Sequence, residues 1–326
     1  MNSDDKQLAS PFSTGGGGTA FENQVQIAFV VLMLTGGVVP CLPPWPVKKI
    51  KLQGRYTGYQ TDDFIVFVEE RGTGQTAKLL AQIKHTVSIT KNDSTFGEVI
   101  QAAWSDFNNG GLFNQTSDMF ALITGPLRAT DIENVRTVLE WARHSESAQD
   151  FLNQVTLTKF SSSQKQQKLE AFRSQLKKAN NGVDVSDDEL WRFLKCFYLL
   201  GYDLDIKSGI TLSLLLSHIS QFANTGIPDL WATISREVSS FNQNAGTVTL
   251  ESIAQEIRMA FAQRVRQETI PEEFVRDSTP EPVAAQPEAL RGEQADAVML
   301  ATLLGAWNEK VEGDREAIKE LIEDND

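Results

Sequence analysis

Apolar residues are few in the first 18 residues, which form a polar leader that ends in four glycines. After this leader, apolar residues recur at helical spacing, at Phe21, Val25, Ala28, Phe29 and Leu32. Gly36-Gly37 ends this pattern, and the proline-rich CLPPWP at residues 41–46 excludes regular structure there. The sequence therefore predicts a flexible leader followed by a largely buried helix of about 15 residues.

Alternating and β-branched segments predict strands in the next stretch. Three of them follow one another, VKKIKLQGRY, DDFIVFVEE and KLLAQIKHTVSI, and RGTGQTA between the last two is typical of a hairpin loop. A helix with a capping-box spacing at Thr95 and Glu98, a strand at MFALITG, a helix with the same spacing at Thr130 and Glu133, and a strand at VTLTKF come next. Residues 19–160 are thus expected to form an α/β domain with a mixed sheet flanked by helices.

Helical patterns replace the alternation from residue 161. Ser186 and Glu189 have the spacing of a capping box before ELWRFLKCFYLLGY. Three more helical segments follow: GITLSLLLSHISQFA, DLWATISREVSSF and TLESIAQEIRMAFAQRV. We expect an all-α connector domain at residues 161–266, an acidic, proline-rich linker at 267–295, and short helices at 296–326. These last helices either begin a further domain or dock on the body of the protein.

Composition excludes several classes of protein. A length of 326 residues indicates about two domains. Hydrophobic residues make up 41% and charged residues 22%, which is ordinary globular usage. The apolar run at residues 27–34 is far shorter than the about 20 residues of a spanning helix, so no membrane partner is expected. The N-terminus lacks a secretory signal pattern, and the two cysteines, Cys41 and Cys196, are far apart, so we expect a cytoplasmic, reduced setting.

The net charge of −13 is concentrated in the tail. Residues 267–326 hold 16 acidic and five basic side chains, whereas residues 46–91 hold eight basic and four acidic ones. A local positive field matters more to a polyanion than the overall charge does, so an anionic substrate is compatible with this chain. A weaker alternative is that the acidic tail mimics nucleic acid and masks the basic strands.

Polar residues on three neighbouring predicted elements form the main candidate site. Glu22 lies on the first helix, Asp62-Asp63 open the second strand, and Gln82 and Lys84 lie two apart on the third strand. The period of a strand places Gln82 and Lys84 on one face, and the hairpin brings an aspartate close to them. Two adjacent aspartates at a strand end favour a nearby cation or lysine.

These residues supply oxygen ligands of the kind that Mg²⁺ prefers. The donors would be an aspartate carboxylate, the side-chain oxygen of Gln82, the carbonyl oxygen of Ile83 and Glu22. The ammonium of Lys84 could orient a water molecule or stabilise charge on a phosphate.

The order Glu, Asp, Gln-x-Lys resembles the PD-(D/E)xK nuclease superfamily in its Q-x-K variant. More narrowly, GGGGTAFENQVQ, TDDFIVFVEE, KLLAQIKH and LFNQTSDMFALITGPL resemble the double-stranded DNA endonuclease domain of bacterial antiphage effectors, among them CBASS and Avs-type STAND proteins. ELWRFLKCFYLLGYDLDI resembles the connector that follows such a domain, so the likeness covers roughly the first 265 residues.

This resemblance implies a restriction-endonuclease-like fold and metal-dependent hydrolysis of DNA. Asp63 or Asp62 would bind Mg²⁺ or Mn²⁺ together with Gln82 and Ile83, Lys84 would serve catalysis, and Glu22 would support the site. Cleavage would be gated by homo-oligomerisation, with a sensor or NTPase domain expected beyond the C-terminus.

Other interpretations of the same residues remain open. The sequence departs from the common motif because no proline precedes the aspartates and Gln82 replaces an acid, which leaves a catalytically inactive interaction or oligomerisation module as the alternative. Glu22 would then complement a helix dipole, the aspartates would be turn residues, and Gln82 and Lys84 would face solvent. The basic residues of the first strand and the turn after it either contact a DNA backbone or form a solvated strand face; they are Lys48, Lys49, Lys51 and Arg55.

Overall fold

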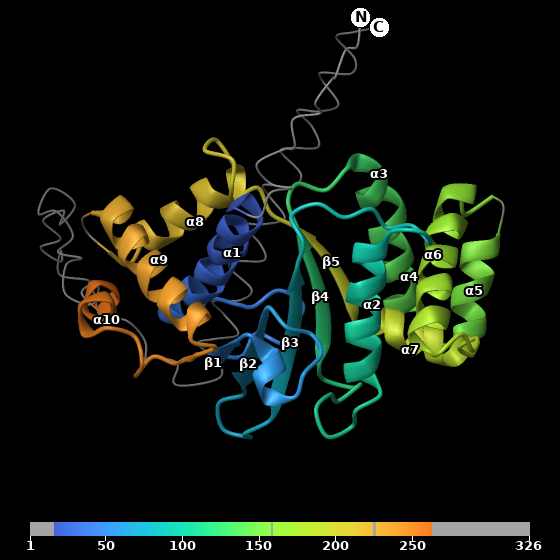
Figure 1. The fold of residues 1–326 in the computed structure, drawn as a ribbon, viewed down its shortest axis with the longest axis horizontal. Helices are drawn as coiled ribbons and strands as arrows, with labels where there is room; N and C mark the ends of the chain where they lie inside the picture. The colour runs from blue at the N-terminus through green and yellow to red at the C-terminus, as the bar shows by residue number, and fades with distance from the viewer. Residues whose placement is uncertain (1–15, 158, 224–225, 263–326) are drawn as a thin grey trace, which may run out of the picture. The chain divides into compact units, whose positions relative to one another are not determined.

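A mixed sheet of six strands forms the middle layer of the structure (Figure 1). The strands lie in the order β5-β4-β3-β2-β1-β6. β3 and β4 pair in parallel, as do β4 and β5, whereas the other neighbours pair antiparallel. The strands are β1 Val47–Leu52, β2 Phe64–Glu69, β3 Thr76–Ile83, β4 Met119–Thr124, β5 Phe197–Gly201 and β6 Thr247–Val248.

This computed structural model describes residues 16–157, 159–223 and 226–262, which belong to a single compact unit. The expected acidic linker at 267–295 and the expected helices at 296–326 lie outside the described residues, as do residues 1–15 of the expected leader.

Helices cover both faces of the sheet (Figure 1). One layer contains α1 Gly16–Thr35, α8 Ile210–Ser220, α9 Ile227–Gln243 and α10 Gln255–Ala262. The other contains α2 Ser94–Phe107, α4 Thr137–His144, α5 Ala148–Thr156, α6 Ser163–Ala179 and α7 Asp187–Cys196. Three short helical turns are η1 Gly54–Thr57, α3 Ala129–Asp131 and η2 Ile132–Arg136.

Alternation along the strands fills two hydrophobic cores, one on each side of the sheet. Phe64 and Val66 of β2 join the core that contains α1, while Ile65 between them joins the core that contains α2. Leu79 and Leu80 of β3 divide in the same way. Burial on both faces explains why these strands have nearly continuous apolar sequences. The expected α/β fold with a mixed sheet flanked by helices is confirmed.

The expected all-α domain at 161–266 is not confirmed, because this stretch contributes two strands to the same sheet. The helix expected over ELWRFLKCFYLLGY ends at Cys196, and the residues after it form β5, which pairs with β4. β6 pairs with β1 through Val248 and Ile50. An apolar run such as FYLLG fits a buried helix and a buried strand equally well, so its period could not distinguish them.

The strand expected over VTLTKF is wrong. Helix α5 continues to Thr156, and its Phe151 and Val155, four residues apart, are both fully buried. Packing on the helical period therefore overrides the strand preference of the β-branched residues. The last three glycines of the expected leader belong to α1, which begins at Gly16.

Helix caps agree with the sequence in one case of three. The capping box of Ser186 and Glu189 at the start of α7 is confirmed. Asp93, and not Thr95, caps α2 by accepting a hydrogen bond from the N–H of Phe96 at 2.7 Å. Thr130 caps no helix, because it lies inside the short α3, which a π turn separates from α4.

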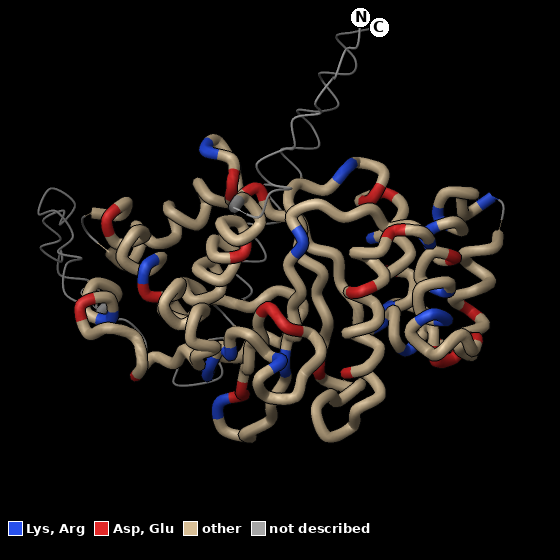
Figure 2. The backbone as a smooth tube through the Cα atoms, in the orientation of Figure 1, with Lys and Arg blue, Asp and Glu red and all other residues tan. Residues whose placement is uncertain are grey.

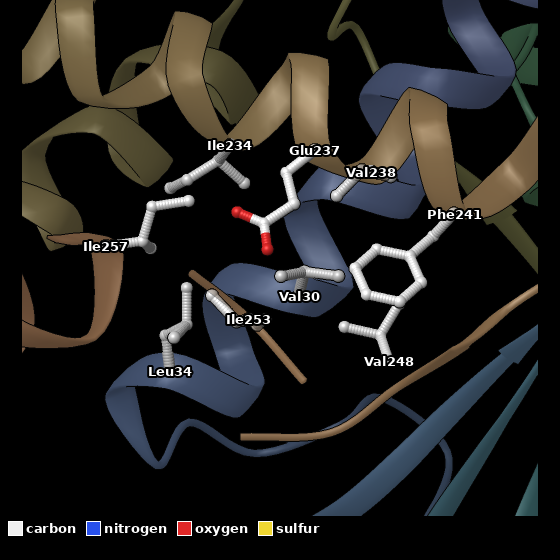
Figure 3. Close-up of a pocket in the computed structure, with 9 residues that line it drawn as sticks. All are labelled: Val30, Leu34, Ile234, Glu237, Val238, Phe241, Val248, Ile253 and Ile257. Atoms are coloured by element: carbon white, nitrogen blue, oxygen red, sulfur yellow. The ribbon is translucent and has the colours of Figure 1, made fainter. Parts of the chain in front are cut away.

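The layer of α1, α9 and α10 is tightly packed around one carboxylate. Figure 3 shows Glu237 of α9 pointing among apolar side chains, including Val30 of α1 and Ile257 of α10. The N–H of Ala254 donates to its Oε1 at 2.6 Å. The space between these side chains is about 10 Å³, which is room for roughly one water molecule and too little for a larger ligand. Among the described helices, none is long and apolar enough to cross a bilayer.

Candidate functional site

The adjoining ends of β2 and β3 bring Asp63 and Gln82 together. Phe64 pairs with Ala81 across the two antiparallel strands, so the residues beyond this pair face each other. Gln82 Nε2 donates to Asp63 Oδ2 at 2.9 Å, and the N–H of Ile83 donates to the same oxygen. The sequence prediction that a carboxylate lies near Gln82 is therefore realised in the structure.

The two adjacent aspartates have different partners. Asp62 accepts a hydrogen bond from the N–H of Arg55 at 3.1 Å and forms an ion pair with its Nε at 3.6 Å. Its own N–H donates to Gln82 Oε1 at 3.3 Å. The side chain of Asp62 is thus tied to an exposed turn, and Asp63 is the carboxylate held by Gln82 and Ile83.

Glu22 of α1 is surrounded by side-chain amides. Its Oε1 accepts hydrogen bonds from Gln26 Nε2 at 3.0 Å, Asn242 Nδ2 at 3.2 Å and Gln53 Nε2 at 3.5 Å. Asn242 Oδ1 in turn accepts from Gln53 at 2.8 Å and from Gln26 at 3.3 Å. Gln26 Nε2 also lies 3.5 Å from the main-chain carbonyl oxygen of Asp63, which links the Glu22 cluster to the backbone of Asp63.

Sequence reasoning missed these three amides. Gln26 lies one helical turn after Glu22, so the i, i+4 spacing could have identified it. Gln53 precedes the turn η1, and Asn242 is more than 200 residues away on α9. No local pattern links either of them to Glu22.

Burial raises the pKa of both carboxyl groups, and the negative charge of Glu22 adds to this effect at Asp63. Burial, and then the charge of Glu22, raise the pKa of Asp63 to about 7, although the hydrogen bond from Ile83 and the charge of Lys84 oppose this. Burial also raises the pKa of Glu22, against the hydrogen bonds from Asn242 and Gln26 and the charge of Lys84. A bound cation would favour the ionised form of both groups, as cations do next to carboxylates.

Lys84 follows directly after β3. Its backbone N–H donates to the carbonyl oxygen of Ile123 at 2.9 Å, which extends the pairing with β4. The side chain is partly buried, and within the described ranges its ammonium makes no hydrogen bond or ion pair. It nevertheless lowers the pKa of Asp63 and of Glu22, so it lies within electrostatic reach of both.

The oxygens that remain available fit a hard cation. Among the described residues, no hydrogen bond uses Asp63 Oδ1 or Glu22 Oε2, and Gln26 Oε1 is buried without a partner. No group of three His, Cys, Asp or Glu side chains in the described part of the chain could hold a metal by itself. A cation here would therefore need water or amide oxygens in addition to the two carboxylates, which suits Mg²⁺.

Gln82 and Ile83 both donate hydrogen bonds to Asp63, which is not the role that the sequence predicted for the Gln82 side chain. Both give N–H groups to Asp63, and Gln82 Oε1 is occupied by the N–H of Asp62. The side-chain oxygen of Gln82 would reach a metal only after its amide rotates. In the present arrangement the two residues orient and solvate Asp63.

Each of the four basic residues expected to contact DNA has a partner in the structure. Lys48 forms an ion pair with Glu69 at 3.0 Å, and Lys49 lies 4.5 Å from the centre of the Phe67 ring. Lys51 donates to the carbonyl oxygen of Ala245, and Arg55 is held by Asp62. Figure 2 shows acidic and basic residues interspersed along the described chain. Arg55 is the one of the four that is tied directly to an aspartate of the candidate site.

Comparison with known proteins gave distant structural matches. No family model and no curated protein matches this chain. Two structures of the SAVED/CARF-domain receptor Cap4 from Acinetobacter baumannii, one of them with the cyclic trinucleotide 3'3'3'-cAAA, align at 12% identity with a TM-score of 0.41. Each alignment covers 75% of this chain and 46% of the other, so the chain spans less than half the length of those receptors.

Proposed function

We propose that this chain is a metal-dependent endonuclease that hydrolyses phosphodiester bonds of double-stranded DNA. The observation that carries the proposal is the meeting of Asp63 and Gln82 at the ends of β2 and β3, with the ammonium of Lys84, which has no partner among the described residues, within electrostatic reach. A partly buried lysine without a hydrogen bond or ion pair among the described residues costs stability. Such a group is better explained by a substrate phosphate than by packing.

Each residue has a distinct part in the proposed reaction. Asp63 and Glu22 would hold Mg²⁺ or Mn²⁺, which would supply a Lewis acid for the phosphate and lower the pKa of water. Gln82 and Ile83 keep Asp63 in place. Lys84 would stabilise the negative charge that grows on phosphorus oxygens as water attacks and the P–O bond to the leaving group breaks. The attacking water releases a proton to solvent, and the leaving oxygen takes one from solvent.

The substrate and setting of the proposal rest on the motif resemblance. It supports duplex DNA as the substrate and bacterial antiphage defence in the cytoplasm as the role, with cleavage gated by homo-oligomerisation through a sensor or NTPase domain. Arg55, which is 67% exposed beside Asp62, is the best placed of the basic residues to contact the DNA backbone near the site.

Plasmid cleavage and metal binding together test the proposal. The full chain is incubated with supercoiled plasmid in Mg²⁺ or in EDTA, beside Lys84→Ala and Asp63→Ala. Lys91→Ala, in the exposed loop after β3, is the matched control. We expect the wild type and the control to nick the plasmid in Mg²⁺ and not in EDTA. Equal cutting by all four proteins would assign the activity to another site or to a contaminant.

If the wild type does not cut, Mn²⁺ binding measured by electron paramagnetic resonance shows whether the site is intact. Binding that Asp63→Ala abolishes would mean a competent site that awaits assembly. Absence of both cutting and Mn²⁺ binding would reject the nuclease and favour the inactive interaction module.

A further inference from the structure

A cavity of about 560 Å³ lies at the amino ends of β4 and β5, whereas the candidate site lies at the carboxyl end of β3. Its lining includes Met119, the first residue of β4, and Tyr198 near the start of β5. Asp63 and Gln82 instead lie near the carboxyl end of β3, which runs parallel to β4. Cavities of roughly 300–1,000 Å³ are typical of small-molecule sites in proteins.

Aromatic rings and cations alternate in the wall of this cavity. The guanidinium of Arg143 lies 3.9 Å from the centre of the Tyr198 ring, and Lys195 Nζ lies 4.3 Å from the centre of a Trp191 ring. Both aromatic side chains are partly exposed. The indole N–H of Trp191 donates to the carbonyl oxygen of Ala142 at 2.9 Å, which fixes the plane of the ring. The wall is therefore ordered before any ligand arrives.

The charged side chains that line the cavity are all positive. The lining contains Arg143, Arg192 and Lys195 but no acidic residue. Arg143 is neutralised by Glu140 at 2.7 Å and Arg192 by Asp188 at 2.8 Å, both from outside the lining. Lys195 has no ion pair with any residue that the structure describes. One positive charge therefore remains uncompensated beside apolar and aromatic surface.

A simpler explanation covers only part of this arrangement. Lys195 lies in the last turn of α7, where cations complement the helix dipole. That role requires neither a cavity nor two fixed aromatic rings, and it does not involve Arg143 of α4.

We propose that this cavity binds a nucleotide, with the phosphate at Lys195 and Arg192 and the base against Trp191 and Tyr198. Bases stack on aromatic side chains and on guanidinium planes, and phosphates are held by charge-assisted hydrogen bonds. The nucleotide is either a free nucleoside monophosphate or one unit of a nucleic-acid strand, since the two share this chemistry. The site is separate from the proposed nuclease centre and does not depend on it.

Calorimetric titration of the full chain in EDTA tests this proposal, because EDTA prevents metal-dependent cleavage. The probes are AMP, adenosine, inorganic phosphate and a short single-stranded oligonucleotide. We expect AMP to bind at least roughly tenfold more tightly than adenosine or phosphate, because each lacks one half of the interaction. Lys195→Ala should weaken AMP binding by about tenfold or more, and Lys195→Arg should restore most of it.

Two controls separate this site from others. Lys165→Ala removes a lysine that lies 6.0 Å from the Trp141 ring, outside the cavity, and should leave AMP affinity unchanged. Asp63→Ala should also leave it unchanged. Binding of the oligonucleotide but not of AMP, lost in Lys195→Ala, would identify a nucleic-acid strand as the source. The proposal is overturned if neither AMP nor the oligonucleotide binds, or if phosphate alone binds as tightly as AMP. It is also overturned if Lys195→Ala binds these probes as tightly as the wild type does.

Discussion

Two lysines at opposite ends of β3 have contrasting surroundings. Lys78 forms an ion pair with the buried Asp118 at 3.1 Å and donates to the carbonyl oxygen of Leu112. Asp118 also accepts hydrogen bonds from the N–H groups of Lys78 and Asn114 at 2.9 and 2.8 Å. Lys84 has no such partner in the described ranges, although two carboxyl groups with raised pKa values lie near it.

The difference separates a structural charge from a candidate catalytic one. The buried charge at Lys78 is compensated by hydrogen bonds and an ion pair, so it needs nothing further. At the other end of the same strand, the ammonium and the carboxyl groups are left incompletely paired. Such incomplete pairing favours the binding of an additional ion or phosphate.

The largest expected effect is on activity at Lys84. Lys84→Ala should reduce plasmid cleavage in Mg²⁺ by on the order of a hundred- to thousand-fold, because charge on the transferring phosphate loses its cationic partner. The urea midpoint of unfolding should not fall, because the ammonium has no partner to lose among the described residues. Cleavage at the wild-type rate would show that Lys84 takes no part in the reaction.

Lys78 should show the opposite behaviour. Lys78→Met leaves Asp118 buried without its cation and should lower the free energy of unfolding by about 3 kcal/mol. Urea denaturation followed by circular dichroism measures this loss, with Lys84→Met as the matched control. Equal losses in the two variants would contradict the contrast drawn between the two ends of β3.

The raised pKa of Asp63 predicts that Asp63→Asn increases the free energy of unfolding in a pH-dependent way. The folded protein resists ionising a carboxyl group whose pKa is about 7, so its contribution to stability is lost as pH rises from about 4 through 7. The neutral variant avoids this loss, and at pH 8 in EDTA it should be about 2–4 kcal/mol more stable than the wild type. The difference should disappear near pH 4. Thermal unfolding at both pH values measures it, and a variant less stable at pH 8 would contradict the assignment.

The smallest effect is expected at Asp62. Its ion pair with Arg55 is exposed, and such pairs contribute about 0–1 kcal/mol. Asp62→Asn should therefore change the free energy of unfolding by less than about 1 kcal/mol. Cleavage should fall much less than in Asp63→Ala. A loss of cleavage as large as that of Asp63→Ala would show that Asp62 is the metal ligand instead.

The sequence was informative where neighbours in space are also neighbours in a hairpin or on a helix. The proximity of Asp63 and Gln82 follows from alternation on two adjacent strands joined by a short loop. The choice between Asp62 and Asp63 did not follow, because it depends on the turn that ties Asp62 to Arg55.

Contacts across long sequence separations could not be predicted. Asn242 reaches Glu22 because α9 packs beside α1, and β5 and β6 pair with strands formed much earlier in the chain. The strand preference of VTLTKF was overridden by the burial of Phe151 and Val155 on a helix. In each case tertiary packing, which has no local signal, decided the outcome.

The way the sheet is completed also limits how such a protein can be divided or recombined. A fragment ending at residue 160 would lack both outer strands, β5 and β6, and the amide that Asn242 gives to Glu22. Exchange of genetic segments at that position would expose the flanks of β1 and β4 and remove a partner of the candidate centre. The whole stretch from α1 to α10 must therefore be kept together. Its second half supplies strands and an amide on which the site proposed in its first half depends.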